Sequence, residues 1–470
     1  MPLAPAIVWL RQDLRLTDNP ALAAAAAGGR PVIAVHILDE TLGGASRWWL
    51  DKSLRALAAD LEARGSRLIL RRGDPALQLG EIIATTGAEA VYWNRLYDKA
   101  SVARDSEIKS DLKADGVEAV SCNGALLIEP WEVKNGSCEP YRVFTPYWRA
   151  ARAKIEDCPA HAAPARLATP DRWPDSDRLD DWALHPGKPD WSGGFDIWTP
   201  GEAGAEAELT RFLDGRIDAY PEARDIPGVE GTSRLSPHLH FGEIGPRQVW
   251  RAVQTAGGGS ASAAKFLAEL GWREFNHHIL FHWPDLPTAN FKPAFDAFEW
   301  RDDDAGFEAW TKGLTGYPIV DAGMRELWAT GFMHNRVRMI VASFLIKDLL
   351  VDWRRGEAWF MDTLVDADIA QNAANWQWVA GSGADASPFF RIFNPVTQGE
   401  KFDPDGVYVR KWIPELARVS SKAIHAPWTA TRTDLAGAGV TLGVTYPSPI
   451  VDHAVARIRA LDSYVAVRRG

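Results

Sequence analysis

The sequence predicts two folded parts: a doubly wound parallel α/β domain followed by an all-helical domain. Three observations support this. Short apolar runs alternate with helical patterns at the start of the chain, a proline-rich stretch follows, and helical periodicity continues to the end. At 470 residues the chain is also too long for one ordinary core. We therefore expect an α/β domain over residues 1–130, a linker over 131–200 and a helical domain over 201–470.

Five short apolar runs predict the strands of the first domain. They are Ala6–Leu10, Pro31–Leu38, Arg67–Leu70, Ala90–Trp93 and Val117–Val120. Helical patterns lie between them, for example over Trp48–Ala63 and Ser106–Ala114. Strand–helix repeats with short connections predict a mostly parallel sheet. No G-x-G-x-x-G fingerprint follows the first run, so we expect no ordinary dinucleotide site there.

The rest of the chain is predicted to be a surface linker and then helices. Prolines crowd residues 131–200, which is typical of an irregular connector with a few short helical turns. In the later part, apolar residues at three- and four-residue spacing predict a core-facing helix over Val337–Leu350. A last helix is expected over Ile450–Val467.

Composition limits the location and the partners of the protein. No apolar run approaches the roughly 18 residues that cross a bilayer, and the cysteines Cys122, Cys138 and Cys158 form neither a disulfide framework nor a zinc spacing. We expect a cytoplasmic protein without a membrane partner. The net charge of -10 counts against nucleic-acid binding unless one face carries a local basic patch.

Three hydroxyl side chains, Thr232, Ser233 and Ser236, precede a predicted helix start. Ser236 would be the N-cap, and Pro237 would take the first helical position. The free N–H groups and the dipole of such a helix end suit an anion, for example the diphosphate of a cofactor. An ordinary capped helix explains the same residues when they are taken alone.

A second group of polar and aromatic residues shares one helical face: Glu269, Trp272, Arg273 and Asn276. An aromatic plane beside a carboxylate and a guanidinium suits a flat, hydrogen-bonding ligand such as a base. The alternative is a solvated polar face. Nearby, His278 and His282 are four residues apart but lack the Glu of the H-E-x-x-H zinc pattern. Packed or capping histidines are expected there, and no metal.

Two further helical faces are expected later in the chain. Asn335, Arg338 and Met339 share one of them, and Asp368, Asn372 and Trp376 follow at four-residue steps if Asp366–Trp376 is helical. Paired carboxylates with an amide could bind a metal, but an amide and an indole suit an organic ring better. Arg338 is the expected partner of Asp366 or Asp368, because buried charges need pairing.

Together these segments resemble the photolyase/cryptochrome family, and within it the microbial class I and class III enzymes for cyclobutane pyrimidine dimers. The similarity covers nearly the whole chain from Ile7–Arg15 onward and is most specific over Asn375–Asp403. The segments Gly231–Pro237, Trp272–Phe275 and Met333–Met339 also carry it. It implies an N-terminal α/β domain, a long linker and a helical domain that holds FAD, in agreement with the pattern.

Carried over residue by residue, the resemblance implies an FAD pocket. Its residues would be Tyr220, Thr232, Ser233, Arg234, Leu235, Ser236, Arg338, Asp366, Asp368 and Asn372. Asn372 matches the position that faces the flavin N5, where an amide can accept a hydrogen bond. Members specialised for photosignalling often hold Asp or Cys there, so Asn372 favours a repair enzyme.

The resemblance also implies the lesion site. Enzymes for the (6-4) photoproduct carry two histidines where this chain has Asn335 and Met339, as enzymes for cyclobutane dimers do. Glu269 would hydrogen-bond the thymine carbonyls and stabilise the radical anion, while Trp272 and Trp378 would pack on the flipped dimer. The remaining candidate contacts to DNA or to the pocket rim are Arg224, Arg273, Asn276, Asn335, Arg336, Met339 and Arg391.

The implied activity is light-driven repair of cyclobutane pyrimidine dimers in damaged DNA by a monomer. Excited, reduced FAD would donate one electron to the dimer and recover it afterwards. Trp300, Trp353 and Trp376 align with the family's chain for photoreducing oxidised FAD. They would join Glu269 and Asn372 as the catalytic set. The alternatives are a cryptochrome-like blue-light photoreceptor without repair activity and an electron-transfer flavoprotein without DNA.

A second, light-harvesting chromophore is left open by the sequence. Folate-binding members hold an Asn-Glu pair where this chain has Ala100-Ser101, just before Val102–Asp105. A differently bound folate, a deazaflavin and an empty antenna cleft are all compatible with this departure. We expect the segment Gly43–Leu50 to line that cleft or to pack near it, with an ordinary helix start as the alternative.

Overall fold

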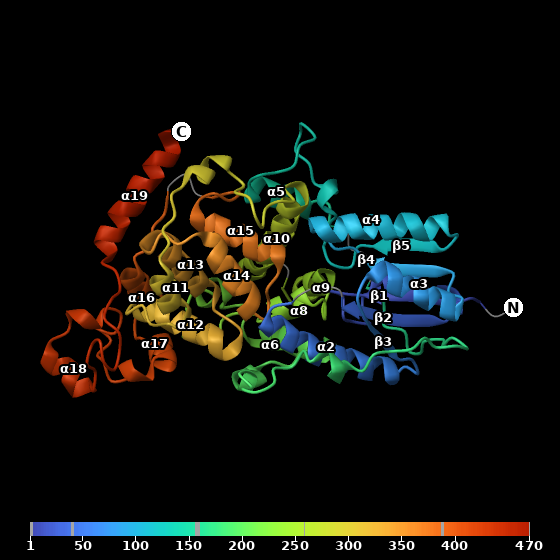
Figure 1. Cartoon of the computed structure of the whole chain (residues 1–470), viewed down its shortest axis with the longest axis horizontal. Helices are drawn as coiled ribbons and strands as arrows, with labels where there is room; N and C mark the ends of the chain where they lie inside the picture. The colour runs from blue at the N-terminus through green and yellow to red at the C-terminus, as the bar shows by residue number, and fades with distance from the viewer. Residues whose placement is uncertain (1–2, 39–41, 156–159, 258, 387–389, 470) are drawn as a thin grey trace. The chain divides into compact units, whose positions relative to one another are not determined.

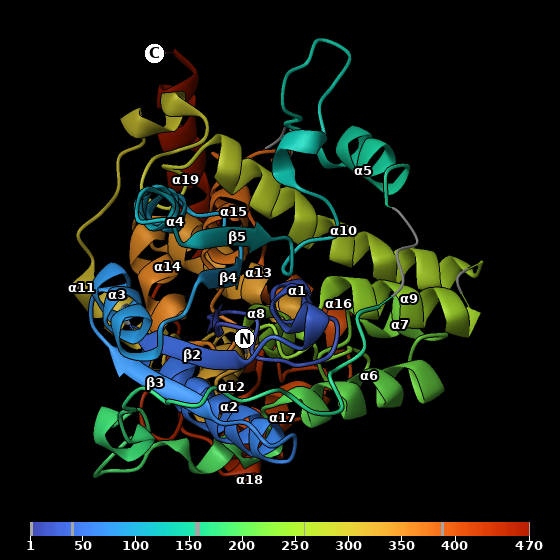
Figure 2. The ribbon, with the colours of Figure 1, turned by 90° about the vertical axis from the view of Figure 1, so that its right-hand side faces the viewer.

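In the computed structural model, the five apolar runs near the N-terminus form one parallel sheet (Figure 1). The strands are β1 (Ala6–Leu10), β2 (Val32–Leu38), β3 (Leu68–Arg72), β4 (Ala90–Asn94) and β5 (Glu118–Cys122). Their order is β3-β2-β1-β4-β5. All five are labelled in Figure 1, and Figure 2 shows β2 and β3 at one side of the sheet and β4 and β5 at the other. The predicted strands are therefore confirmed. β3 and β5 each begin one residue and end two residues later than predicted, because their last residues carry no apolar pattern.

Helices connect the strands, which makes the sheet doubly wound as predicted. They are α1 (Pro20–Ala26), α2 (Gly44–Glu62), α3 (Pro75–Thr86) and α4 (Lys99–Ala114). Side chains of Asn19, Asp74 and Asp98 cap α1, α3 and α4 by accepting backbone N–H groups. One face of the sheet packs on α3 and α4 in a shared apolar core.

The structure describes residues 3–38, 42–155, 160–257, 259–386 and 390–469. They fall into two compact units, each built from separate stretches of the chain. The first comprises Met1–Trp191, Asp196–Ile217 and Ser233–Pro284. The second comprises Ser192–Phe195, Asp218–Thr232 and Asp285–Gly470. The domain limits at residues 130 and 200 stay predictions.

Besides the sheet and its connecting helices, the first unit contains most of the predicted linker and, after it in the chain, the helices α6 (Glu202–Gly215), α8 (Ser236–His240), α9 (Pro246–Gly257) and α10 (Ala261–His282). The linker is irregular as expected, apart from short 3-10 turns and the nine-residue helix α5 (Phe144–Arg152). It covers the free edge of the sheet, because Leu70 N donates to Ser176 Oγ (3.0 Å) and Asp177 N donates to Leu70 O (2.8 Å).

The second unit is helical. It contains α7 (Tyr220–Ala223), α11 (Asp304–Thr311), α12 (Pro318–Thr330), α13 (Asn335–Ser343), α14 (Trp353–Thr363), α15 (Ile369–Ala380), α16 (Pro395–Phe402), α17 (Val407–Trp412), α18 (Arg432–Ala438) and α19 (His453–Arg469). The helix predicted over Val337–Leu350 is α13, continued by a π-helical turn over Phe344–Asp348. Its predicted apolar stripe is buried in the core of this unit. The last helix begins and ends slightly later than expected.

Within the described part of the chain, no helix is long and apolar enough to cross a membrane. Cys122 and Cys138 are free thiols, and Cys158 lies outside the described residues.

Candidate active site

A loop of backbone amides precedes α8, where the sequence predicts an anion site. Arg234 has a left-handed backbone (φ 55°), and Leu235 returns to the right-handed helical region (φ -83°, ψ -8°). Two successive residues of opposite hand turn their N–H groups toward one point, and such nests bind anions. The Leu235 N–H donates to Ser233 Oγ at 3.4 Å, a long hydrogen bond that an anionic group such as a cofactor diphosphate could replace.

The predicted helix start at this loop is wrong in detail. Leu235 is the N-cap, Ser236 is the first helical residue, and neither makes a side-chain capping bond. α8 has only five residues, so few peptide dipoles add up in it. The anion-binding geometry comes from the strained loop rather than from a hydroxyl-capped helix. Arg234 places its guanidinium 4.3 Å from the ring centre of Trp198.

A buried ion pair links α13 to the segment before α15. Arg338 Nη2 donates to both carboxylate oxygens of Asp366 at 3.0 and 2.9 Å. The exposed fractions of the two side chains are 24% and 5%. Arg338 Nε also donates to the carbonyl oxygen of Met333 at 2.7 Å. The predicted partnership of Arg338 with Asp366 is confirmed.

Asp368 begins α15 instead of lying inside it. Its carboxylate accepts the N–H of Gln371 at 2.9 Å, and this cap ends the extended backbone before the helix. The prediction of one helical segment over Asp366–Trp376 is thus wrong for its first three residues. Asn372 and Trp376 do lie one turn apart in α15, and both side chains are buried.

The amide of Asn372 is oriented by Glu357 on α14. Asn372 Nδ2 donates to the backbone carbonyl and to Oε1 of Glu357, both at 2.9 Å. Because a carbonyl oxygen can only accept, these contacts fix which end of the amide carries the N–H groups. Asn372 Oδ1 is left as an acceptor, which fits an N–H donor of a bound ring such as the flavin N5.

The three tryptophans assigned to electron transfer all belong to the core of the second unit or pack against it. Trp376 is 2% exposed, and its ring centre lies 5.0 Å from Phe360 and 6.3 Å from Trp310. Trp353 is fully buried and donates Nε1 to Asn290 Oδ1 at 3.1 Å. Trp300 is only partly buried, as the outer end of a chain that leads to solvent would be.

Gly356 leaves room for the indole of Trp376. A Cβ atom at this position of α14 would lie 2.2 Å from Trp376 Cη2 and 2.6 Å from Cζ3. Both distances are far inside van der Waals contact. The missing side chain therefore allows α14 and the ring on α15 to meet.

The residues of α10 that are predicted to face the lesion lie partly at the surface and partly inside the first unit. Glu269 is half-buried, with Lys265 Nζ 3.3 Å from Oε1. The Trp272 ring stacks on Phe144 with centroids 3.8 Å apart. Arg273 donates Nη1 to the backbone oxygen of Ala125 at 2.8 Å. Arg273 and Asn276, which is buried, are thus engaged within the unit rather than held out toward DNA.

The residues of the second unit that are predicted to face the lesion lie at or near its surface. Asn335 and Arg391 are exposed, and Met339 and Trp378 are half-buried. Met339 Sδ lies 3.6 Å from Arg336 Nη1.

The carboxylate of Asp225 lies close to the positive charges of two of the arginines predicted to contact DNA. Arg336 Nη2 donates to Asp225 Oδ1 at 2.9 Å, and Arg224 Nε lies 3.9 Å from the same atom. Arg224 also covers the buried ring of Tyr220, with Cζ 5.4 Å from the ring centre. Part of the basic charge expected for phosphate binding is therefore neutralised inside this unit.

His278 and His282 have a structural partner in common. His278 Nδ1 and His282 Nε2 lie 3.0 and 3.2 Å from the carbonyl oxygen of Pro130. Burial lowers the pKa of His278 to about 4, so its ring is neutral at physiological pH. Among the described residues, no group of three His, Cys, Asp or Glu side chains could hold a metal ion.

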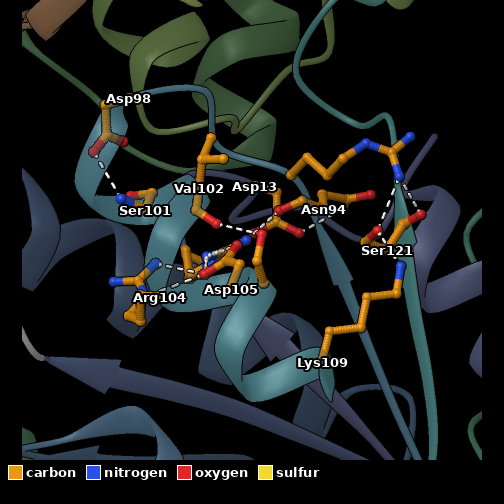
Figure 3. A network of polar contacts seen from close by, with 12 residues as sticks. Asp13, Asn94, Asp98, Ser101, Val102, Arg104, Asp105, Lys109 and Ser121 are labelled. Atoms are coloured by element: carbon orange, nitrogen blue, oxygen red, sulfur yellow. Dashed lines mark hydrogen bonds and ion pairs between the residues drawn. The ribbon is translucent and has the colours of Figure 1, made fainter. Parts of the chain in front are cut away.

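The segment aligned with the family's folate site is tied into a polar network at the carboxyl ends of β1 and β4 (Figure 3). Asp105 accepts Arg11 Nη1 through both oxygens at 2.9 and 2.8 Å. Asn94 Nδ2 donates to Asp13 Oδ2 at 2.6 Å. The Ser101 N–H is used by the capping residue of α4. These groups have structural partners, and the antenna stays a prediction.

The tryptophans in the segment Gly43–Leu50 are packed inside the first unit. Trp48 and Trp49 are both buried, and Trp49 Nε1 donates to Glu243 Oε1 at 2.9 Å. The second carboxylate oxygen of Glu243 pairs with His238 Nδ1 at 2.5 Å. The segment starts α2, which is the structural alternative that the sequence left open.

Comparison with known proteins identifies the family of the chain. Residues 6–168 match the family model described as DNA photolyase, and residues 266–466 match the FAD binding domain of DNA photolyase. Over 99% of its length the chain is 55% identical to the deoxyribodipyrimidine photo-lyase of Agrobacterium fabrum and covers 98% of that protein. It belongs to the photolyase/cryptochrome family.

Two further members of the photolyase/cryptochrome family show how wide the similarity is. A bacterial class III photolyase from Agrobacterium tumefaciens superposes with a TM-score of 0.98 at 55% identity, covering 100% of this chain and 99% of its own. Cryptochrome-1 of Arabidopsis thaliana is 39% identical over 96% of this chain and 69% of its own length. The predicted fold, an α/β domain with a helical FAD-binding domain, is confirmed.

Two residues that contact predicted site residues have no signal in the sequence pattern. Glu357 occupies an ordinary helical position, and only the packing of α14 on α15 brings it to Asn372. Phe144 lies in the predicted linker, yet it contacts α10. A search for carboxylates that could buttress Asn372 from a neighbouring helix would have found the first. No local rule points to the second.

Glu357 should make the stability of the protein depend on pH. Burial raises the pKa of Glu357 from 4.5 to about 7, opposed by the hydrogen bond from Asn372. Between these values the folded chain keeps a proton that the unfolded chain has released, so the free energy of unfolding falls as pH rises. Glu357→Gln keeps the acceptor and removes the ionisation. Above pH 7 it should stabilise the flavin-free protein by about 1–2 kcal/mol, a value discounted for partial exposure.

The measurement is thermal unfolding of wild type and Glu357→Gln over a pH series. The exposed Glu299 provides a matched control, since Glu299→Gln removes a carboxylate of ordinary surroundings. Parallel curves for wild type and Glu357→Gln would contradict the raised pKa.

Proposed function

We propose that this chain is a light-driven deoxyribodipyrimidine photo-lyase that repairs cyclobutane pyrimidine dimers in DNA. The observation that carries the proposal is the amide of Asn372, which Glu357 holds with its oxygen free to accept a hydrogen bond. The lesion positions support it as well, because Asn335 and Met339 stand where enzymes for the other photoproduct need two histidines.

FAD, when bound in its reduced form, supplies light absorption and a single electron that the dimer returns once two carbon–carbon bonds have broken. The protein's own residues bind and orient FAD and the dimer. The nest at Arg234–Leu235 would bind the diphosphate, and Asn372 Oδ1 would accept an N–H of the flavin edge. In its carboxylic acid form Glu269 would donate an O–H to a pyrimidine carbonyl oxygen as negative charge develops on the dimer. A damaged base pair costs least to open, which favours the lesion over normal DNA.

The deciding experiment illuminates reduced protein with an oligonucleotide that contains a thymine dimer. Absorbance in the thymine band should recover with light and stay constant in the dark. If illumination brings no recovery although the flavin is fully reduced, the chain is not a repair enzyme. A cryptochrome-like photoreceptor, which the similarity to Cryptochrome-1 supports, would behave in that way.

Glu269→Ala should lower the repair yield while FAD stays bound. A hydrogen bond to a charged acceptor, here the carbonyl oxygen of the dimer radical anion, contributes about 1.5–3 kcal/mol, so we expect a loss of roughly 10- to 100-fold in repair per absorbed photon. Lys265→Ala is the matched control, because it removes the partner of Glu269 on the same helix and leaves the carboxylate. Loss of FAD from Glu269→Ala would instead mark the residue as structural.

The proposal includes a cytoplasmic, monomeric enzyme with damaged DNA as its partner. The absence of a disulfide between the free thiols Cys122 and Cys138 is consistent with a reducing compartment. Light scattering of the purified protein measures the oligomeric state, and its absorption spectrum identifies the antenna chromophore.

A further inference from the structure

We propose that Phe144 is a positioning residue for the lesion. It holds the indole of Trp272 as a flat, fixed platform on which the flipped dimer stacks. This inference rests on the proposed function, and it extends the lesion site into residues 131–200, a stretch that looks like a passive linker in the sequence.

The centroids of the Phe144 and Trp272 rings are closer together than those of most aromatic pairs in proteins. The centroids of Phe144 and Trp272 are 3.8 Å apart and the ring planes are inclined by only 8°. Aromatic pairs usually keep their centroids about 4.5–7 Å apart in offset or edge-on arrangements. The Phe144 ring therefore lies directly over the indole and covers one of its faces.

A second ring fixes the remaining freedom of Trp272. Phe275 meets it edge-on, with centroids 5.7 Å apart and planes at 78°. One contact against the face and one at nearly a right angle to it define the orientation of the indole. Trp272 nevertheless stays half-buried, and because Phe144 covers one face of the indole, the opposite face is the one left for a base. A base can stack on that face without first ordering the side chain.

The helix that carries Phe144 can pack closely on α10 because α10 has a glycine, Gly271, at the point of contact. Trp148 on α5 stacks on Phe144 with planes inclined by 12°. A Cβ atom at Gly271 would lie 2.6 Å from the ring of Trp148. The residue just before Trp272 must therefore lack a side chain for α5 to approach. Trp378, the other predicted stacking partner, has no such ring contact among the described residues.

The test compares Phe144→Leu, which keeps most of the volume and loses the flat ring, with wild type. Affinity for a dimer-containing duplex should fall about two- to tenfold, the range of an aromatic pair. Affinity for undamaged duplex, the flavin absorbance and the repair rate at saturating DNA should stay unchanged. Phe144→Tyr, which keeps the ring, should retain wild-type affinity. Phe281→Leu is the matched control, because its ring packs on Trp131, away from Trp272.

A double-mutant cycle separates positioning from other roles. In a Trp272→Ala background, Phe144→Leu should cause no further loss of dimer affinity. An additive loss, an unchanged affinity of Phe144→Leu, or an equal loss for undamaged DNA would each overturn the proposal. If Phe144→Leu loses FAD, Phe144→Met replaces it under the same criteria. If Trp272→Ala itself leaves dimer affinity unchanged, the stacking role within the proposed function fails, whatever Phe144 does.

Discussion

Trp376→Phe should abolish the photoreduction of oxidised flavin, while repair by enzyme reduced beforehand should continue. Indole is among the most easily oxidised side chains, and phenylalanine cannot replace it as an electron donor. Trp376 is buried in the core beside Phe360, so a phenylalanine should fit with a modest loss of packing. The measurement follows flavin absorbance under blue light with an external thiol as reductant.

Trp359→Phe is the control for this variant. Trp359 also lies in the second unit, but its ring stacks on the exposed Trp328 with centroids 6.1 Å apart. Its replacement should leave photoreduction intact. Trp353→Phe and Trp300→Phe should slow photoreduction if both belong to the same chain. Slow repair by prereduced Trp376→Phe would contradict a role limited to flavin reduction.

Arg338→Ala should have the largest effect on stability and should empty the FAD site. The carboxylate of Asp366 is almost completely buried, and Arg338 Nη2 donates to both of its oxygens. Removing one partner of a buried ion pair leaves an uncompensated charge, which costs about 3–5 kcal/mol. We therefore expect a lower urea midpoint and little bound flavin after purification.

Arg325→Ala is the matched control for the ion pair. Arg325 Nη1 donates to both oxygens of Glu415 at 2.8 and 3.0 Å, but that carboxylate is 32% exposed. Water can solvate the carboxylate that remains, so the cost should be about 1 kcal/mol or less. Arg338→Lys should recover only part of the loss, because an ammonium cannot match the planar guanidinium. If Arg338→Ala keeps its flavin and lowers the free energy of unfolding no more than Arg325→Ala does, the buried carboxylate of Asp366 does not need the ion pair with Arg338.

The strands could be predicted well because burial on both faces leaves a continuous apolar run. Ala6–Leu10, buried throughout, matches β1 residue for residue. Helix starts that depend on polar caps were harder to place. The first turn of α4, Lys99–Val102, mixes polar and apolar residues without a hydrophobic period, so only its cap Asp98 marks the beginning.

In the site, partners that obey a strong physical rule were predictable. A buried carboxylate needs a cationic partner, and Asp366 has one in the half-buried Arg338. The N-cap at Ser236 failed because the preceding loop bends earlier, through the left-handed Arg234. Glu357 and Phe144 act through contacts between distant elements, and no local period or motif encodes those.

The narrow space at Gly356 links two positions of the sequence. Glycine inside a helix costs roughly 0.5–1 kcal/mol relative to alanine, so α14 carries a penalty that its own backbone does not need. The ring of Trp376 occupies this space, and a methyl group at position 356 would overlap with it. The two positions should therefore vary together among relatives. A chain with a smaller residue at 376 is free to regain a helix-forming side chain at 356, and the presence of the glycine marks the chains that keep the indole.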